Sequence, residues 1–138
     1  KDKWVILLAL TSNTGSQDFQ TKQSDNVKLY QQVIKTASTW ANSDQLMYVV
    51  GATKAEEFQQ IRQLAPDNFI LVPGVGAQGG SLSAVCNYGL NSQCGLLINA
   101  ARSIIYASDG LDFAEKARKE ALILQQEMAQ ILTANNLI

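Results

Sequence analysis

Several residues and patterns are rare or missing in this sequence of 138 residues, and each absence excludes a class of function. There is no histidine, which excludes Ser-His-Asp and Cys-His catalysis within the chain. Cysteine occurs only at Cys86 and Cys94, so a zinc site built from cysteine and histidine is excluded too. Two cysteines near apolar segments are more typical of buried thiols than of a disulfide, and we expect free thiols and no metal.

The sequence also has no hydrophobic run long enough to cross a bilayer, which takes about 18 to 20 residues. The longest run covers residues 4–10, and no signal-peptide pattern precedes it. Eleven basic and twelve acidic side chains give a net charge of -1, so the basic surplus typical of nucleic-acid binding is missing. We therefore expect a soluble, cytoplasmic chain that binds neither membranes nor nucleic acid.

Strand and helix patterns alternate along the whole chain. Continuous apolar runs, typical of buried strands, cover residues 4–10, 46–50 and 69–72, and a fourth strand is predicted at residues 96–100. Each run is followed by a helical segment, most clearly where apolar residues recur every three or four positions. Trp40 and Met128 fall on such apolar stripes, so we expect both in the core.

Four successive strand-helix units predict an α/β fold with a parallel sheet and right-handed crossovers. Two architectures fit this order. One is a small flavodoxin-like layer, and the other is four units of a (β/α)8 TIM barrel, which typically needs about 250 residues. No linker or low-complexity segment divides the chain, and the alternation of elements does not choose between the two.

In both architectures ligands bind at the carboxyl ends of the strands. These ends carry few ionisable side chains: Lys54, Arg102 and, further along its loop, Asp18. This scarcity favours binding over proton transfer. At the first end, residues 12–14 (Ser-Asn-Thr) offer small donors and acceptors that suit the edge of a planar ring, although the residues alone favour a simple polar turn.

The third strand end is rich in glycine, at Gly74, Gly76, Gly79 and Gly80. Backbone amides in such a loop can wrap an anion, and the guanidinium of Arg102, after the next strand, can bind phosphate oxygens in a bidentate way. The loops after the last two strands of barrels often form a phosphate site. We predict one here; the alternative is a tight glycine turn beside a surface arginine.

The same loop also matches the dinucleotide-binding pattern GxGxxG at residues 74–79. The acidic residue expected roughly 20 positions later is missing. The pattern follows the third strand, whereas it usually follows the first. Dinucleotide binding is therefore the weaker interpretation of this loop.

Three segments resemble orotidine 5'-monophosphate decarboxylase. Residues 72–80 (VPGVGAQGG) and 99–107 (NAARSIIYA) resemble its carboxyl-terminal half, and residues 8–16 (LALTSNTGS) resemble its fifth-strand segment, especially in the second bacterial subgroup. The resemblance covers nearly the whole chain. It implies that residues 1–138 are the carboxyl-terminal half of a single TIM-barrel domain, with strands five to eight.

The resemblance also implies how the substrate, orotidine monophosphate, or the product, uridine monophosphate (UMP), would be held. Gln78 and Arg102 would bind the 5'-phosphate, with help from the amide of Ala101, and Gly79 would belong to the loop that closes over the ligand. Contacts with the phosphate, remote from the reacting carbon, can stabilise the closed arrangement. Binding energy would thereby be converted into rate.

Two further contacts follow from the same resemblance. Ser12 would hydrogen-bond the pyrimidine ring and meet Gln78 when the loop closes. Pro73 and Val75 would form an apolar wall near the carboxylate that leaves as carbon dioxide. The implied reaction belongs to pyrimidine biosynthesis and uses no metal or organic cofactor.

The sequence departs from the family in one respect: the catalytic lysine and aspartates, in the pattern DxKxxD, do not occur. The chain would thus contain no catalytic residue, would be inactive alone and would need the amino-terminal half as a partner, in an enzyme that is commonly a homodimer. Two alternatives remain. One is a non-catalytic phosphate- or nucleotide-binding module with a flavodoxin-like fold, and the other is a different barrel enzyme that acts on a sugar phosphate.

Overall fold

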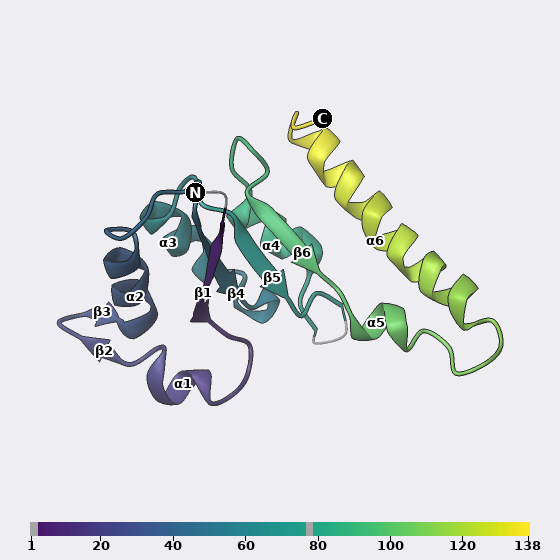
Figure 1. Cartoon of the computed structure of the whole chain (residues 1–138), viewed down its shortest axis with the longest axis horizontal. Helices are drawn as coiled ribbons and strands as arrows, with labels where there is room; N and C mark the ends of the chain where they lie inside the picture. The colour runs from purple at the N-terminus through teal and green to yellow at the C-terminus, as the bar shows by residue number, and fades with distance from the viewer. Residues whose placement is uncertain (1–2, 77–78) are drawn as a thin grey trace.

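The fold is a parallel sheet with helices between its strands (Figure 1). A computed structural model describes residues 3–76 and 79–138. The sheet has the order β1-β4-β5-β6, formed by β1 (Val5–Leu10), β4 (Leu46–Val50), β5 (Ile70–Pro73) and β6 (Leu96–Asn99). All three pairings are parallel. The predicted α/β fold with a parallel sheet is confirmed.

The helices form one layer that follows the order of the strands. The longer ones are α2 (Leu29–Ala37), α3 (Glu57–Leu64), α4 (Leu82–Gly89) and α6 (Phe113–Ala134), and each packs against the next along the chain. A doubly wound sheet reverses its strand order at a switch point, whereas this order never reverses. The winding therefore favours part of a barrel over a flavodoxin-like layer. In the described parts of the chain, none of the helices has the length and apolarity of a membrane span.

Short elements complete the chain and shape the loops. They are α1 (Ser16–Phe19), the hairpin strands β2 (Gln23–Ser24) and β3 (Val27–Lys28), the 3-10 helix η1 (Ala52–Lys54) and α5 (Arg102–Ile105). Both η1 and α5 follow directly on the carboxyl end of a strand. The chain therefore turns sharply where the ligand site is expected.

The core lies between the sheet and the helices. Its largest fully buried side chains include Tyr48 and Ile70 on the strands and Ile34, Phe58 and Ile61 on the helices. This agrees with the apolar runs and helical stripes of the sequence.

The two cysteines are free thiols, as predicted, and Cys86 is buried while Cys94 is half-buried. Burial raises the pKa of the Cys86 thiol to about 11, so it stays protonated at neutral pH. Met128 packs against the core, with its Sδ 3.8 Å from Cys86 Sγ, which confirms its predicted position on the inner face of α6.

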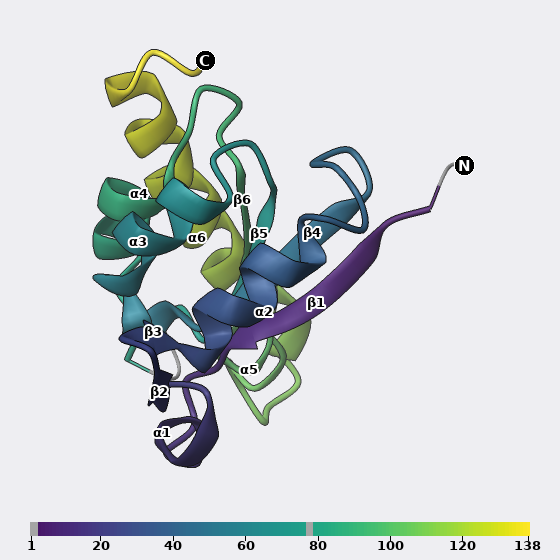
Figure 2. The ribbon, with the colours of Figure 1, turned by 90° about the vertical axis from the view of Figure 1, so that its left-hand side faces the viewer.

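Two predictions of burial are wrong. Trp40 is 71% exposed, because α2 ends at Ala37 and Trp40 lies in the turn beyond it. β1 was expected to be buried on both faces, but Val5 is 59% exposed and Leu8 58% exposed. The reason is that β1 forms an edge of the sheet and, within the described residues, pairs only with β4 (Figure 2).

A charged cluster joins the beginnings of α2 and α3. Glu57 accepts hydrogen bonds from Lys28 Nζ at 2.5 Å and from the Tyr30 hydroxyl at 2.6 Å. Burial alone would raise the pKa of Glu57, but the two hydrogen bonds outweigh it and hold the pKa below its ordinary value. Burial and the neighbouring carboxylate raise the pKa of Tyr30. The carboxylate is therefore the form that stabilises the fold.

We expect this cluster to make the fold sensitive to acid. Since the folded-state pKa of Glu57 is lowered, its stabilisation is complete above the ordinary value of 4.5 and is lost as the pH falls through the folded-state pKa. Glu57→Gln should lower the free energy of unfolding by about 2 kcal/mol at pH 7. It should also reduce the pH dependence of that free energy between pH 7 and acidic pH. Urea unfolding at several pH values measures both effects. If the free energy of unfolding of Glu57→Gln depended on pH as strongly as that of the unmodified chain, the acid sensitivity would come from other carboxylates.

Candidate functional site

A small cavity lies between the carboxyl ends of β5 and β6. Pro73 and Asn99 are paired in the parallel register, so the loops that follow them run side by side. The cavity measures about 170 Å³ and is lined by Pro73, Gly74, Val75, Asn99, Ala100, Ala101 and Arg102. Four residues predicted from the sequence therefore meet here, namely Pro73, Val75, Ala101 and Arg102.

Arg102 supplies the positive charge of this cavity. It is the first residue of α5 and is exposed. The ion pairs found in residues 3–76 and 79–138 are Lys28–Glu57 and Lys116–Asp112, so none in this part of the chain engages Arg102. Because Pro73 and Val75 are apolar, the cavity combines a cationic rim with an apolar wall, an arrangement suited to an anionic ligand with an apolar part.

The glycine-rich loop is folded on itself. Gly74, Gly76 and Gly79 all have positive φ, a backbone conformation that glycine adopts without strain. The amide of Gly76 donates to the carbonyl oxygen of Gly80 at 3.0 Å, and the amide of Gly79 donates to the carbonyl oxygen of Gly76 at 2.8 Å. The Gly80 amide likewise donates to the Gly74 carbonyl at 3.2 Å.

This bonding corrects one detail of the sequence interpretation. We expected the loop to present unsatisfied amides to an anion, but the amides of Gly76, Gly79 and Gly80 already have partners within the loop. Arg102 is therefore the described group best placed to bind an anion. Gly79 lies in this turn and not in the cavity wall, and Gln78 lies outside the described residues.

Ser12 lies at the end of β1 and not in the cavity wall. Its Oγ is buried and has no hydrogen-bond partner among residues 3–76 and 79–138. A buried hydroxyl without a partner costs about 1 to 3 kcal/mol. Because the Oγ is inaccessible to solvent in this structure, a ligand at this end of the sheet would reach it only after a local rearrangement.

The end of β4 connects Ser12 with the glycine-rich loop. A Cβ atom on Gly51 would overlap Ser12 Oγ, and one on Gly80 would overlap the Cβ of Ala52. The sequence placed Gly51 and Ala52 at a strand end but indicated no role for them, because neither carries a functional group. A glycine directly after a buried strand was the signal that could have identified this close packing.

Acidic and sulfur ligands do not gather at this end of the sheet. Across residues 3–76 and 79–138, no group of three Cys, Asp or Glu side chains is close enough to hold a metal ion. The ionisable groups at the described strand ends, Lys54 and Arg102, are both cationic. The carboxyl edge of the sheet therefore carries positively charged side chains that can bind anions.

Comparison with known proteins gives consistent matches. Residues 1–117 match the orotidine 5'-phosphate decarboxylase / HUMPS family. The orotidine 5'-phosphate decarboxylase of Flavobacterium johnsoniae is 64% identical over 132 residues, which are 96% of this chain and 48% of that protein. The one from Porphyromonas gingivalis is 56% identical over 137 residues, which are 99% of this chain and 50% of that protein.

Solved structures agree with the sequence matches. The OMP decarboxylase of Leishmania donovani superimposes with a TM-score of 0.77 and 32% identity, covering 94% of this chain and 48% of that one. The UMP synthase of the same organism gives a TM-score of 0.79 and 36% identity, and the match covers 94% of this chain and 28% of that one. The chain spans about half the length of the curated relatives it matches.

Proposed function

Because the chain belongs to the orotidine 5'-phosphate decarboxylase / HUMPS family, we propose that residues 1–138 are the carboxyl-terminal half of a decarboxylase barrel. The complete enzyme would convert orotidine monophosphate to UMP and carbon dioxide in pyrimidine biosynthesis. The observation that carries this proposal is the cavity in which Arg102 adjoins Pro73 and Val75. It offers a site for the phosphate beside an apolar wall.

Arg102 would bind the 5'-phosphate of the nucleotide. Its guanidinium is exposed at the rim of the cavity and can form charge-assisted, bidentate hydrogen bonds with phosphate oxygens. The backbone of Ala101 lines the same cavity. Gln78, in the glycine-rich loop, would complete the phosphate contacts, with Gly79 allowing the loop to approach the ligand.

Ser12 would hold the pyrimidine ring. Its buried hydroxyl has no partner in the part of the chain that the structure describes, so a ring oxygen or nitrogen that reached it would satisfy it. Pro73 and Val75 would lie against the substrate carboxylate, where an apolar wall disfavours its negative charge. The group leaves as neutral carbon dioxide, and the electron pair of the broken bond stays on the ring carbon. These contacts would favour the transition state over the charged ground state.

The bond-breaking step itself needs charges that this chain lacks. The DxKxxD pattern is missing, so the aspartates that oppose the carboxylate and the lysine that protonates the product carbon would come from the amino-terminal half. No metal or organic cofactor takes part in this proposal. The chain alone would bind nucleotide without decarboxylating it, and the assembled enzyme would be a homodimer.

Calorimetric titration of the chain with UMP tests the proposal. We expect UMP to bind and uridine, which lacks the phosphate, to bind at least tenfold more weakly, because the charge-assisted bonds to Arg102 are worth about 1.5 to 3 kcal/mol. Arg102→Ala should weaken the binding of UMP by a similar factor and leave the affinity for uridine unchanged. Arg118→Ala removes an exposed arginine on α6 and serves as the control.

Two results would contradict this assignment. Equal affinity of the Arg102→Ala and Arg118→Ala variants for UMP would show that Arg102 does not bind the phosphate. Tighter binding of a nicotinamide dinucleotide than of UMP would favour the GxGxxG interpretation of the glycine-rich loop.

A further inference from the structure

The turn that follows β1 is fixed to the rest of the chain by one amide side chain. β1 pairs with β4 as far as Leu10 and Val50, and the Gly51 amide donates to the Leu10 carbonyl oxygen at 2.8 Å where this pairing ends. The Thr11 amide comes next and lies beyond the paired residues. Gln20 takes the place of a strand partner there, because its Oε1 accepts a hydrogen bond from the Thr11 amide at 2.8 Å.

Gln20 is itself held by the helices on either side of it. Its amide donates to the Ser16 carbonyl oxygen in α1 at 2.9 Å, and its carbonyl oxygen accepts a hydrogen bond from the Tyr30 amide at 3.0 Å. Tyr30 is fully buried at the start of α2. The Thr11 hydroxyl adds a further contact with Gln20 Oε1 at 3.2 Å. The core therefore anchors Gln20, and Gln20 anchors Thr11.

Ser12 is the residue whose position depends on this anchor. Its backbone follows directly on Thr11, and its Oγ lies so close to Gly51 that a Cβ there would overlap it. With the backbone held, rotation about the Cα–Cβ bond is the simplest rearrangement that turns the hydroxyl toward a ligand. Hydrogen bonds weaken steeply when they are misaligned, so a displaced Ser12 backbone would lose a ligand contact even after this rotation.

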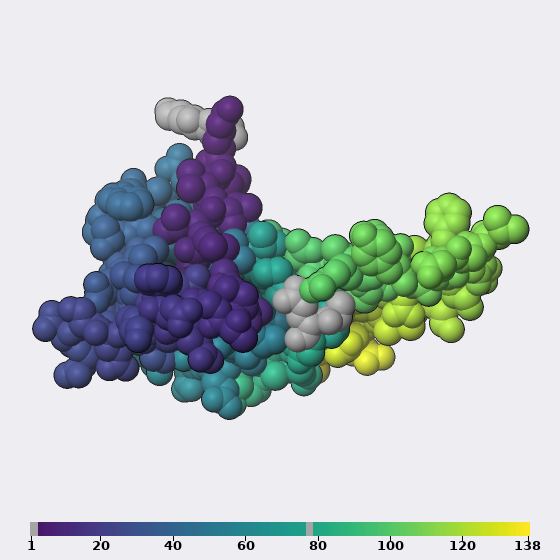
Figure 3. Space-filling view, turned by 90° about the horizontal axis from the view of Figure 1, so that it is seen from below, coloured from purple at the N-terminus to yellow at the C-terminus, as the bar shows by residue number. Residues whose placement is uncertain are grey.

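The position of Ser12 fits a ligand that is held at two ends. Only β4 separates β1 from β5, and since neighbouring strands lie about 4.8 Å apart, the end of β1 is roughly 10 Å from that of β5. This is about the reach of a nucleotide from its phosphate to its base. Figure 3 faces the carboxyl ends of the strands and shows the segments that follow β1 and β6, in purple and green, exposed on this one face. Arg102 and Ser12 can thus contact opposite ends of one nucleotide.

We propose that Gln20 is a positioning residue for Ser12. It holds the backbone where the Ser12 hydroxyl can turn to the pyrimidine ring, and it thereby sets how strongly the site prefers a nucleotide to a bare sugar phosphate. This inference rests on the proposed function, because it takes Ser12 as the contact for the ring. Gln20 does not line the cavity beside Arg102 and acts only through the turn after β1.

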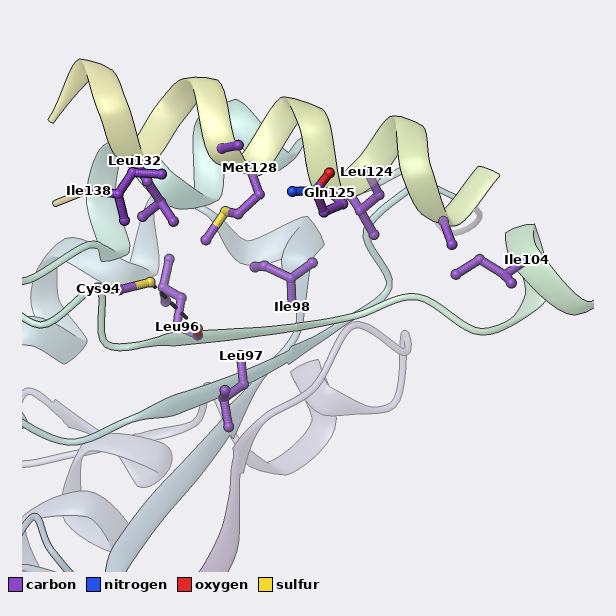
Figure 4. A pocket seen from close by; sticks show the side chains of 12 residues that line it. Cys94, Leu96, Leu97, Ile98, Ile104, Leu124, Gln125, Met128, Leu132 and Ile138 are labelled. Carbon is purple, nitrogen blue, oxygen red and sulfur yellow. Dashed lines mark hydrogen bonds between the residues drawn. The ribbon is translucent and has the colours of Figure 1, made fainter. Parts of the chain in front are cut away.

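The apolar groove between β6 and α6 is the alternative place for the base (Figure 4). Its volume is about 540 Å³, and among the described residues that line it Gln125 carries the amide side chain. An amide can donate to and accept from the edge of a base. A base in the groove would therefore depend on Gln125, whereas a base at Ser12 would depend on Gln20.

Calorimetric titration with UMP and with ribose 5-phosphate tests the proposal, because ribose 5-phosphate has the phosphate and the sugar but no base. Gln20→Leu removes the acceptor of the Thr11 amide and should lower the preference for UMP over ribose 5-phosphate about fivefold, as the loss of one hydrogen bond to the ring does. Gln20→Glu keeps an Oε acceptor and should restore the preference. Its added charge would act on the phosphate that both ligands share.

Two further glutamines provide matched controls. Gln17→Leu makes the same substitution at an exposed residue of α1, and Gln125→Leu makes it in the groove. Both variants should keep the preference of the unmodified chain. The proposal is overturned if Gln20→Leu also keeps it, if Gln20→Glu does not restore it, or if Gln125→Leu lowers it instead.

Hydrogen exchange of the Thr11 amide, followed by NMR without ligand, separates this inference from the proposed function. We expect exchange to be at least tenfold faster in Gln20→Leu, while the Gly51 amide keeps its rate because its partner, Leu10, is unchanged. An unchanged rate at Thr11 would overturn the positioning role even if UMP bound. If the unmodified chain bound neither ligand, the proposed function would fail, and faster exchange at Thr11 would still support Gln20 as the anchor of this turn.

Discussion

Replacing Arg62 with methionine is expected to lower the free energy of unfolding by about 4 kcal/mol. Arg62 lies in the last turn of α3 and donates hydrogen bonds to carbonyl oxygens of four residues. Nε binds Gly89 O at 2.6 Å and Nη2 binds Gly95 O at 2.7 Å, while Nη1 binds the carbonyls of Asn68 at 2.7 Å and Ala65 at 3.1 Å. One side chain thus joins the loops that precede β5 and β6.

The expected effect is large because methionine keeps the apolar stem but leaves these carbonyls without their donor. Burial lowers the pKa of Arg62 to about 10, which still leaves the guanidinium charged at neutral pH. Arg62→Lys should recover only part of the loss, since an ammonium group cannot reproduce the fork of a guanidinium. Urea unfolding of both variants measures the effect.

Arg118→Met is the matched control, because Arg118 is exposed and should cost less than about 0.5 kcal/mol. The loops that Arg62 joins precede the strands, whereas the candidate ligand cavity follows them. Affinity for UMP at low temperature should therefore be retained in Arg62→Lys. If Arg62→Met were as stable as Arg118→Met, the four hydrogen bonds would contribute nothing net.

The strand-helix order could be predicted because buried parallel strands and amphipathic helices have distinct patterns. The limits of the prediction are equally physical. Periodicity identified the stripe that contains Trp40 but not the end of α2 at Ala37. The apolar run of β1 predicted burial on both faces, and the described chain supplies cover for only part of it.

The site shows the same division. Pro73, Val75, Ala101 and Arg102 could be brought together from sequence, because adjacent parallel strands end at the same edge of a sheet. The sequence did not predict that carbonyl oxygens of the same loop would accept hydrogen bonds from the amides of Gly76, Gly79 and Gly80. Such pairing depends on loop geometry, which the glycine count does not specify.

Gly51→Ala is expected to destabilise the chain by about 3 kcal/mol, as overpacking at a rigid position does. Gly51 has an ordinary extended backbone, with φ -67 and ψ 138, so alanine causes no backbone strain there. The added Cβ would nevertheless overlap Ser12 Oγ and lie 2.8 Å from the Ser12 amide nitrogen. Since Ser12 is the proposed contact for the pyrimidine ring, affinity for UMP should fall as well.

Removing the obstructing side chain provides the decisive comparison. Ser12→Gly takes away the Oγ and the Cβ that the new methyl group would meet, and only the backbone contact remains. We expect the double variant Gly51→Ala, Ser12→Gly to be about 1 to 2 kcal/mol more stable than the sum of the single effects. Gly110→Ala is the control, because its Cβ would meet two polar side-chain atoms of a loop, Asp112 Oδ1 at 3.0 Å and Ser108 Oγ at 3.5 Å. Strict additivity in this cycle would show that Ser12 and Gly51 do not pack against each other, and the position of Ser12 in the site would have to be revised.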